Sequence, residues 1–137
     1  MRVLVVGGYG LIGSQVVAAL HAAGHEVTGA GRDIRRAKRR FPFARWERAD
    51  LATFGAADWA PLLTGVDAVI NCAGALQDGP RDDLTAVHVT GLVALASAAE
   101  AAGVRRLIHV SAAGRRKTPA PSAAPSLPAR PHFSRKR

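Results

Sequence analysis

Cysteine, tyrosine and methionine each occur only once among the 137 residues, and aromatic residues make up 5% of the chain. A single cysteine, Cys72, excludes an intramolecular disulfide and provides no thiolate pair for a metal centre. We therefore expect no metal site and a reducing, cytoplasmic location. No apolar run is long enough to cross a bilayer, and the apolar start of the chain is too short for a signal peptide. We expect a protein that has no membrane partner.

Acidic residues are missing from the end of the chain. Residues 115–137 contain seven of the 19 Lys and Arg residues, five prolines and no Asp or Glu. Residues 1–114 therefore carry 12 basic residues against 10 acidic ones, although the whole chain has a formal charge of +9. A segment with few large apolar side chains cannot bury enough surface to offset its loss of conformational entropy. We predict a folded domain over residues 1–114 and a disordered, basic, Pro/Ala/Ser-rich tail over residues 115–137.

Strand and helix patterns alternate along the first 114 residues. Short apolar runs predict strands over residues 2–7, 25–31, 45–50, 67–72 and 106–111. Helical spacing of apolar residues and helix-ending glycines predict helices over residues 10–23, 34–41, 58–63 and 82–102. Such alternation is typical of parallel sheets with right-handed crossovers. We predict an α/β fold, a doubly wound parallel sheet of about five strands in the order 3-2-1-4-5 that is truncated after its fifth strand.

A glycine-rich turn joins the first predicted strand to the first helix. Residues 7–13 read Gly-Gly-Tyr-Gly-Leu-Ile-Gly, a pattern that in this context binds the phosphates of a dinucleotide. The first glycine permits the tight turn, the glycine at position 10 lets the backbone approach a pyrophosphate, and the last lets the helix lie close to the sheet. Free amides and the helix dipole stabilise the pyrophosphate charge. A purely structural turn is the alternative. We predict that the cofactor contacts Gly7, Tyr9, Gly10, Leu11, Ile12 and Gly13. We also predict a positive φ at Gly10.

The Gly-x-x-Gly-x-x-Gly spacing resembles that of the short-chain dehydrogenase/reductase superfamily, in particular its extended and atypical, NAD-dependent epimerase/dehydratase-like members. Ala49-Asp50-Leu51, Asn71-Cys72-Ala73-Gly74 and Val87-His88-Val89-Thr90-Gly91 are similar to further motifs of that family, with His88 where it usually has Asn. The resemblance covers residues 1–114 and implies an N-terminal Rossmann half. It also implies that the carboxylate of Asp50, in its motif with Leu51, meets the adenine amino group. Asn71, Ala73 and Gly74 would line the adenine ribose.

The second predicted strand ends at Arg32, nineteen residues after Gly13. An Asp or Glu at such a position selects NAD by binding the ribose 2′-hydroxyl, whereas an Arg accommodates the 2′-phosphate of NADP. Guanidinium and phosphate pair through two charge-assisted hydrogen bonds. Arg36 or Arg35, one helical turn further on, offers a second contact. We predict NADP as the cofactor, with NAD as the alternative because Asp33 can still reach a ribose.

The expected catalytic residues are missing from the sequence. The resemblance implies a catalytic Tyr with a Lys four residues later, but the chain has no Tyr-x-x-x-Lys, and Tyr9 lies in the glycine-rich turn. Ser111 is a candidate for the catalytic serine after the fifth strand, with Ala112 as the alternative register, and a structural role is at least as well supported. His88 and His109 have acid–base chemistry, but packing explains them better. We predict an NAD(P)(H)-binding domain of oxidoreductase or epimerase type that is catalytically incomplete.

Two other functions stay open. One is a non-enzymatic NADP-binding sensor or assembly module. The other is binding of anions or nucleic acid through residues 32–40 and the tail, which we favour least because stacking aromatics are few there. The sequence identifies no small-molecule substrate, and the change of character at Arg115 favours a truncation or a shifted reading frame. Without a helix after the fifth strand, Leu107, Val110 and part of residues 89–95 would be uncovered, so we expect self-association through the fourth helix and fifth strand.

Overall fold

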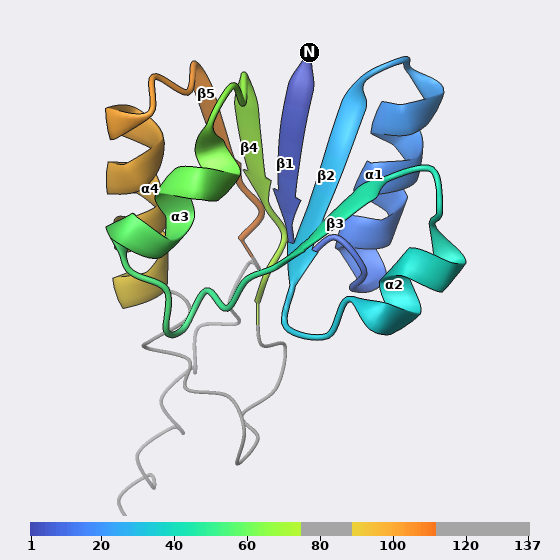
Figure 1. The fold of residues 1–137 in the computed structure, drawn as a ribbon, viewed down its shortest axis with the longest axis horizontal. Helices are drawn as coiled ribbons and strands as arrows, with labels where there is room; N and C mark the ends of the chain where they lie inside the picture. Colours follow the sequence, from blue (N-terminus) through green and yellow to red (C-terminus); the bar gives the residue numbers. More distant parts are fainter. Residues whose placement is uncertain (75–88, 112–137) are drawn as a thin grey trace, which may run out of the picture.

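The computed structural model of the chain describes residues 1–74 and 89–111. A single sheet contains β1 (Arg2–Val6), β2 (Glu26–Gly31), β3 (Arg45–Arg48), β4 (Ala68–Asn71) and β5 (Arg106–His109). The strands pair in parallel in the order β3-β2-β1-β4-β5. Figure 1 shows them side by side, with their carboxyl ends toward the bottom of the view. The predicted doubly wound parallel sheet and its strand order are confirmed.

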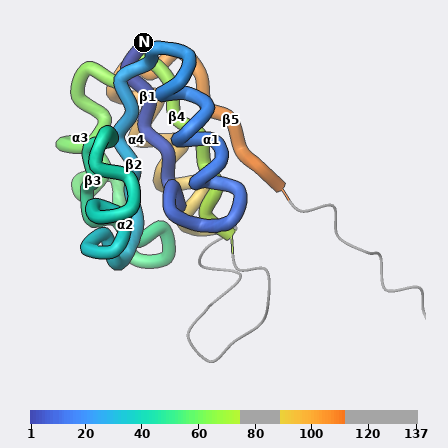
Figure 2. Tube along the Cα trace, turned by 90° about the vertical axis from the view of Figure 1, so that its right-hand side faces the viewer, coloured from blue at the N-terminus to red at the C-terminus, as the bar shows by residue number. Residues whose placement is uncertain are grey.

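Helices cover both faces of this sheet. The helices α1 (Leu11–Ala22) and α2 (Arg35–Arg40) lie on one face, and α3 (Ala56–Leu63) and α4 (Gly91–Ala101) lie on the other (Figures 1 and 2). Each face has its own core, in which Val17 of α1 and Leu95 of α4 are fully buried. Strand β1 contributes to both cores, because alternate residues of a strand point to opposite faces. Two covered faces therefore explain its continuous apolar run.

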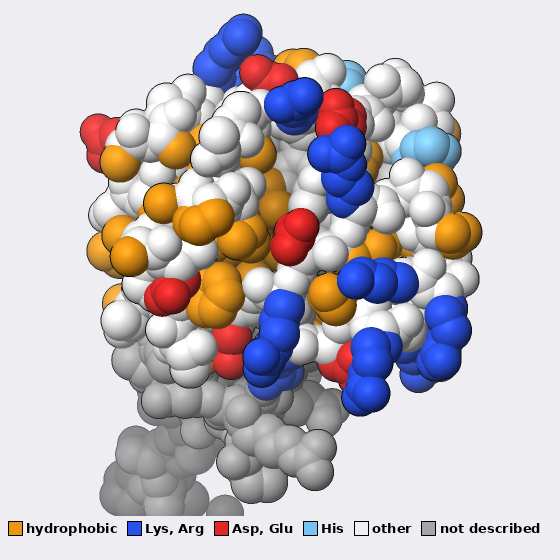
Figure 3. Space-filling view, viewed as in Figure 1, with side chains coloured by type: hydrophobic (Ala, Val, Ile, Leu, Met, Phe, Trp, Pro, Cys, Tyr) orange, Lys and Arg blue, Asp and Glu red, His pale blue; other side chains and the backbone are white. Residues whose placement is uncertain are grey.

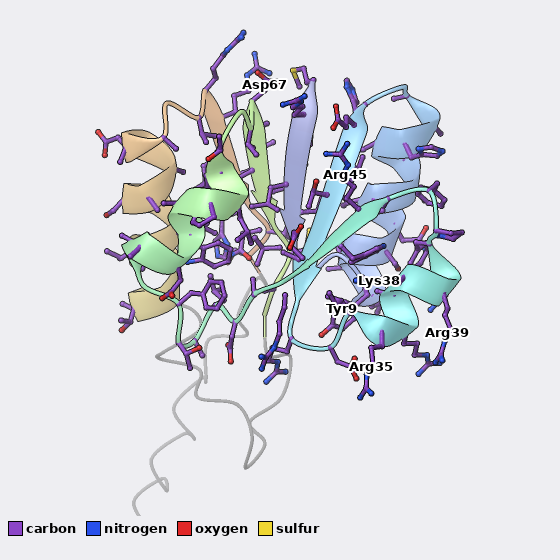
Figure 4. All side chains as sticks on the ribbon, viewed as in Figure 1. Tyr9, Arg35, Lys38, Arg39, Arg45 and Asp67 are labelled. Carbon is purple, nitrogen blue, oxygen red and sulfur yellow. The ribbon has the colours of Figure 1, made fainter. Side chains whose placement is uncertain are left out.

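Asp67 joins the amino ends of three neighbouring strands. Its Oδ2 accepts a hydrogen bond of 2.7 Å from the backbone N–H of Arg2, and its carbonyl oxygen accepts one of 3.0 Å from Arg105. The hydrogen bond from Arg2 lowers the pKa of Asp67 below its ordinary value, and the Arg105 guanidinium, 3.7 Å away, contributes in the same direction. These contacts align β1, β4 and β5 at their amino ends. The glycine-rich turn lies at the opposite, carboxyl ends of the strands, as the positions of Asp67 and Tyr9 in Figure 4 show.

Several element boundaries differ from those predicted. The helix predicted over residues 58–63 begins at Ala56, because Asp58 accepts a hydrogen bond of 2.8 Å from the N–H of Gly55 and so stabilises an earlier start. Strands β3 and β5 end at Arg48 and His109, two residues earlier than predicted. Residues 82–88 of the fourth predicted helix and residues 115–137 of the predicted tail lie outside the described residues. The domain boundary at 114 therefore stays a prediction.

None of the helices in the described part of the chain has the length and apolarity needed to cross a membrane. Within residues 1–74 and 89–111, no group of three or more His, Cys, Asp or Glu side chains could hold a metal ion.

Candidate functional site

A cleft of about 220 Å³ lies at the carboxyl ends of β1, β2 and β4. Strand β1 is where the strand order reverses, and such switch points are the usual ligand sites of open α/β sheets. Most of the lining comes from the predicted cofactor motifs, and the rest are their neighbours at the strand ends. The lining residues are Val6, Gly7, Tyr9, Gly10, Gly31, Arg32, Ala49, Asp50, Leu51, Cys72, Ala73 and Gly74.

The glycine-rich turn is held against the ends of β2 and β4. Gly7 has a φ of +73°, a conformation that favours glycine. Its N–H donates a hydrogen bond of 2.8 Å to the carbonyl of Ala30, and its own carbonyl accepts one of 3.1 Å from Gly10. A Cβ on Gly7 would lie 2.6 Å from the backbone nitrogen of Ala73. Both its φ and its close neighbour therefore require glycine at this position.

Gly10 and Gly13 differ in what they provide. Gly10 has φ −70° and ψ 179°, an extended conformation that any residue adopts, so the positive φ expected there is wrong. A Cβ on Gly10 would meet only the carbonyl oxygen of Gly7, at 3.4 Å, so the space beside Gly10 is open. A Cβ on Gly13 would overlap that same carbonyl oxygen. Gly13 thus allows α1 to begin close against the glycine-rich turn, whereas the sequence predicted that it lets the helix lie close to the sheet.

The first turn of α1 supplies amides that suit an anion. Gly10 is its N-cap, no side-chain hydrogen bond caps it, and its first turn contains no acidic residue. The first amides of a helix have no partner within the helix, and they lie at the positive end of its dipole. Leu11 and Ile12 are 78% and 46% exposed and do not line the cleft, as Gly13 does not. Any role of these three residues in binding is therefore assigned to their backbone N–H groups.

Tyr9 connects the glycine-rich turn to the end of β2. Its hydroxyl accepts a hydrogen bond of 3.1 Å from the N–H of Asp33, and its ring lies so close to Gly31 that a Cβ there would overlap it. Arg32, between these two contacts, is exposed and lines the cleft. Arg36 does not line it, but faces a neighbouring hollow of about 260 Å³ that Tyr9 also borders. The structure thus brings Arg32 to the predicted site and separates Arg36 from it.

The loop after β3 forms another wall of the cleft. Asp50 Oδ1 accepts a hydrogen bond of 3.0 Å from the N–H of Ala52, and the Asp50 carbonyl accepts one of 2.8 Å from Phe54. This local turn fixes the direction in which the chain leaves the sheet. Leu51 is buried in the core beneath α3 while also lining the cleft.

The segment after β4 places its residues at different depths. Ala73 and Gly74 line the cleft, whereas Asn71 is fully buried beneath it. The Oδ1 of Asn71 accepts a hydrogen bond of 3.1 Å from the N–H of Ala73, and its Nδ2 lies 3.2 Å from Nδ1 of His109. Cys72 is half-buried and lines the cleft, and burial raises the pKa of its thiol. Sequence motifs did not reveal the contact with His109, since it depends on the pairing of two distant strands.

None of the catalytic candidates within the described residues lines the cleft. Ser111 is exposed, follows the end of β5 and does not line the cleft. His88 and the alternative serine position, Ala112, lie outside the described residues. His109 is a residue of the sheet, as expected.

A glycine-rich turn at the switch point of a five-stranded parallel sheet defines a Rossmann-type domain. The sequence profile of the NAD dependent epimerase/dehydratase family matches residues 3–132, and the chain belongs to this family. The resemblance to the extended short-chain dehydrogenases/reductases is confirmed. The matched range continues beyond residue 114, where the motifs we identified in the sequence end.

Individual relatives agree with this assignment. UDP-glucose 4-epimerase of Mycolicibacterium smegmatis is 36% identical over 125 residues, which cover 83% of this chain and 39% of the relative. The structure of UDP-glucose-4-epimerase from Stenotrophomonas maltophila, with bound NAD and formylated UDP-arabinopyranose, matches with a TM-score of 0.71 and 28% identity, over 82% of this chain and 37% of that one. A short-chain dehydrogenase/reductase superfamily protein from Agrobacterium tumefaciens, with bound NAD, matches with a TM-score of 0.65 and 32% identity. This match covers 80% of the present chain and 32% of that protein. The chain thus spans less than two fifths of the length of these relatives.

Proposed function

We propose that this domain binds a nicotinamide dinucleotide in the cleft at the carboxyl ends of β1, β2 and β4. The pyrophosphate would lie on residues 7–13, against the uncapped first turn of α1. The observation that carries this proposal is the open space beside Gly10, next to amides that no side chain caps. Two structural neighbours have bound NAD, which supports the dinucleotide as the ligand class.

The remaining cleft residues fit the adenosine half of such a ligand. Asp50 and Leu51 form the wall proposed for the adenine, and Ala73 and Gly74 form the wall proposed for its ribose. Asn71 supports this second wall from below through its hydrogen bond to Ala73.

We propose NADP as the preferred cofactor. Arg32 lines the cleft at the end of β2, where a guanidinium can pair with a 2′-phosphate. The neighbouring carboxylate of Asp33 is directed toward α2, because its Oδ1 accepts a hydrogen bond of 3.2 Å from the N–H of Arg35 and lies 3.8 Å from that residue's Nε. Asp33 is also not among the residues that line the cleft. NAD, the ligand of the neighbours, is the alternative.

We propose that the chain binds its cofactor without performing the family's reaction. The sequence contains no Tyr-x-x-x-Lys. Ser111 is exposed and is not among the residues that line the cleft. A sensor or assembly module that uses the bound nucleotide is the alternative. We also propose a cytoplasmic location, since a reducing compartment suits a free, half-buried Cys72.

Binding of nucleic acid or another polyanion is the third function to be tested. Exposed basic residues gather over α2, toward the lower right of Figure 3. Figure 4 shows Arg35 and Arg39 of α2 pointing outward into solvent. Such an arrangement is also that of an ordinary solvated helix face, so it gives this function no specific support.

We propose self-association through an apolar surface at the β5 edge of the molecule. The exposed large apolar residues at this edge are Val89, Val93, Leu107 and Ile108, which are 58%, 61%, 37% and 50% exposed. Leu107 and Ile108 are consecutive in β5 and point to opposite faces of the sheet, so exposed apolar side chains lie on both sides of the edge. Strand β5 is at the end of the sheet, so its outer backbone groups have no strand beside them among the described residues (Figure 2). Part of residues 89–95 was expected to be uncovered; Leu95, at the end of this range, is fully buried.

The central test is titration of the purified chain with NADPH and NADH, followed by calorimetry or by nucleotide fluorescence. Tighter binding of NADPH supports both the site and the preference. Equal binding removes the role of Arg32, and binding of neither nucleotide removes the proposed function. Adding a duplex oligonucleotide tests the polyanion alternative, and assaying reduction of a panel of carbonyl compounds tests for turnover.

A further inference from the structure

Asn71 and His109 form a side-chain pair between β4 and β5. They are opposite each other in the strand register, and Asn71 Nδ2 lies 3.2 Å from His109 Nδ1. Asn71 is fully buried and His109 is half-buried. The function proposed above does not use His109, because its side chain is not part of the cleft lining.

The hydrogen-bond partners determine which tautomer His109 adopts. A backbone N–H can only donate, so the Asn71 atom that faces the N–H of Ala73, at 3.1 Å, must be the carbonyl oxygen Oδ1. The atom that faces His109 is then the amide nitrogen, which can only donate. His109 Nδ1 must therefore accept, which requires a neutral ring with its proton on Nε2.

The same contacts continue into the wall of the cleft. Asn71 Oδ1 holds the N–H of Ala73, and the backbone of Ala73 lies against Gly7, where a Cβ would come within 2.6 Å of the Ala73 nitrogen. His109, Asn71, Ala73 and Gly7 thus form a continuous series of contacts from β5 to the glycine-rich turn. Because Asn71 is fully buried, rotation of its amide would leave polar atoms without partners, which is costly.

We propose that His109 is a positioning residue for the cofactor cleft. By accepting a hydrogen bond from Asn71, it fixes the orientation of the Asn71 amide, and this amide in turn holds Ala73 against the glycine-rich turn. This inference rests on the proposed nucleotide binding for its functional consequence. The hydrogen-bonded series itself is a property of the chain without any ligand.

The tautomer is measured first, on the unmodified chain. In long-range proton–nitrogen NMR spectra of the chain with ¹⁵N-labelled histidine, Nδ1 of His109 should have the shift of an unprotonated ring nitrogen at pH 7.5. Loss of one set of signals in His109→Asn assigns it among the five histidines of the sequence. A proton on Nδ1 would overturn the proposal, whether or not any variant folds.

Two variants of similar size then separate hydrogen bonding from packing. His109→Asn keeps an acceptor at the δ position, whereas His109→Leu removes it. We expect the Asn variant to bind NADPH within about twofold of the parent, and the Leu variant to bind it about five- to tenfold more weakly, since a buried donor loses its partner. The backbone amide signal of Ala73 should move in the Leu variant and stay near its original position in the Asn variant. Thermal unfolding of both variants reports any general loss of stability.

The outcomes distinguish this proposal from the proposed function. Equal weakening of NADPH binding by His109→Asn and His109→Leu would show that His109 acts only by packing. Unchanged NADPH binding by His109→Leu would show that His109 has no role in positioning. Binding of neither nucleotide to the parent would defeat the proposed function and the positioning of a cofactor with it. In that case an unprotonated Nδ1 and a displaced Ala73 signal would still establish the hydrogen-bonded series.

Discussion

The hydroxyl of Tyr9 accepts a hydrogen bond from the backbone N–H of Asp33 across 3.1 Å. This contact connects the glycine-rich turn to the segment that follows β2. The Tyr9 ring also covers Gly31, whose missing side chain leaves room for it. Arg32 lies between these two points of contact, so Tyr9 restrains the backbone from which the arginine reaches the cleft.

Tyr9→Phe should narrow the preference for NADPH over NADH while leaving the fold intact. The phenyl ring keeps its packing against Gly31, but the Asp33 N–H loses its acceptor. Asp33 is exposed, so water can replace the hydroxyl, and we expect the free energy of unfolding to fall by no more than about 1 kcal/mol. Titration with both nucleotides, together with urea unfolding, measures the two effects. An unchanged nucleotide preference would show that Arg32 is positioned without this hydrogen bond.

Arg32→Asp should reverse the cofactor preference. The change removes the guanidinium proposed for the 2′-phosphate and adds a carboxylate that repels it, with an effect of about 1–3 kcal/mol on NADPH binding. Arg39→Asp is the matched control, because it makes the same charge change on exposed α2 and does not line the cleft. If both variants weaken NADPH binding equally at low salt, the overall charge of the protein, and not a specific contact, is responsible.

Substitutions at Gly10 and Gly13 should have opposite consequences. Gly10→Val is compatible with the extended backbone, and its Cβ would meet only the carbonyl oxygen of Gly7, so it should retain the fold but fill the space proposed for the pyrophosphate. Gly13→Ala should instead destabilise the protein by about 2 kcal/mol or more, since its Cβ overlaps a backbone carbonyl. Circular dichroism and NADPH titration distinguish these outcomes. Normal binding by Gly10→Val would assign the turn a purely structural role.

Cys72 should react slowly with maleimides, and bound NADPH should slow it further. Burial raises the pKa of its thiol, so less of the reactive thiolate is present at pH 7 than in a free peptide, and the rate should rise as the pH increases. The residue also lines the cleft, where a ligand would shield it. Mass spectrometry is sufficient because the chain has one cysteine. Alkylation in urea provides the unshielded rate, and NADPH-independent labelling in the folded state would place the ligand elsewhere.

Self-association should increase as salt is added. The exposed apolar residues at the β5 edge favour contact between copies, whereas the net charge of +9 opposes it until salt screens the repulsion. Sedimentation at two ionic strengths measures the effect. Ile108→Lys should reduce association, and Phe43→Lys, on a segment next to β3 at the other end of the sheet, should not. A monomer at both ionic strengths would contradict the proposal.

The sheet could be predicted from sequence because its signals are local. The apolar run of β1, the glycines after it and the regular alternation of elements each depend on neighbouring residues. The start of α3 was less accessible, since Gly55 is not one of the usual side-chain caps and Asp58 stabilises the helix by reaching back to its N–H. Motifs likewise located most of the cleft lining, because residues at the carboxyl ends of parallel strands meet at one edge.

Contacts between distant segments could not be predicted in the same way. The pairing of Asn71 with His109 requires the register of β4 and β5. The contact of Tyr9 with Asp33 requires the parallel pairing of β1 with β2, which brings the segments after these two strands together. The conformation of Gly10 was also inaccessible, since a glycine motif does not reveal which glycine adopts a positive φ. In this chain it is Gly7.

The strand order has a consequence for how the protein is made. Strand β1 leaves the ribosome first but lies in the middle of the sheet, between β2 and a strand that begins only at Ala68. Until β4 has emerged, one edge of β1, in which residues 3–6 are apolar, has no partner strand, and an unpaired strand edge of this kind promotes aggregation. The central pairing of the sheet can therefore form only after β4 has been made, and β1 is most vulnerable to aggregation while the segment between β2 and β4 is being synthesised.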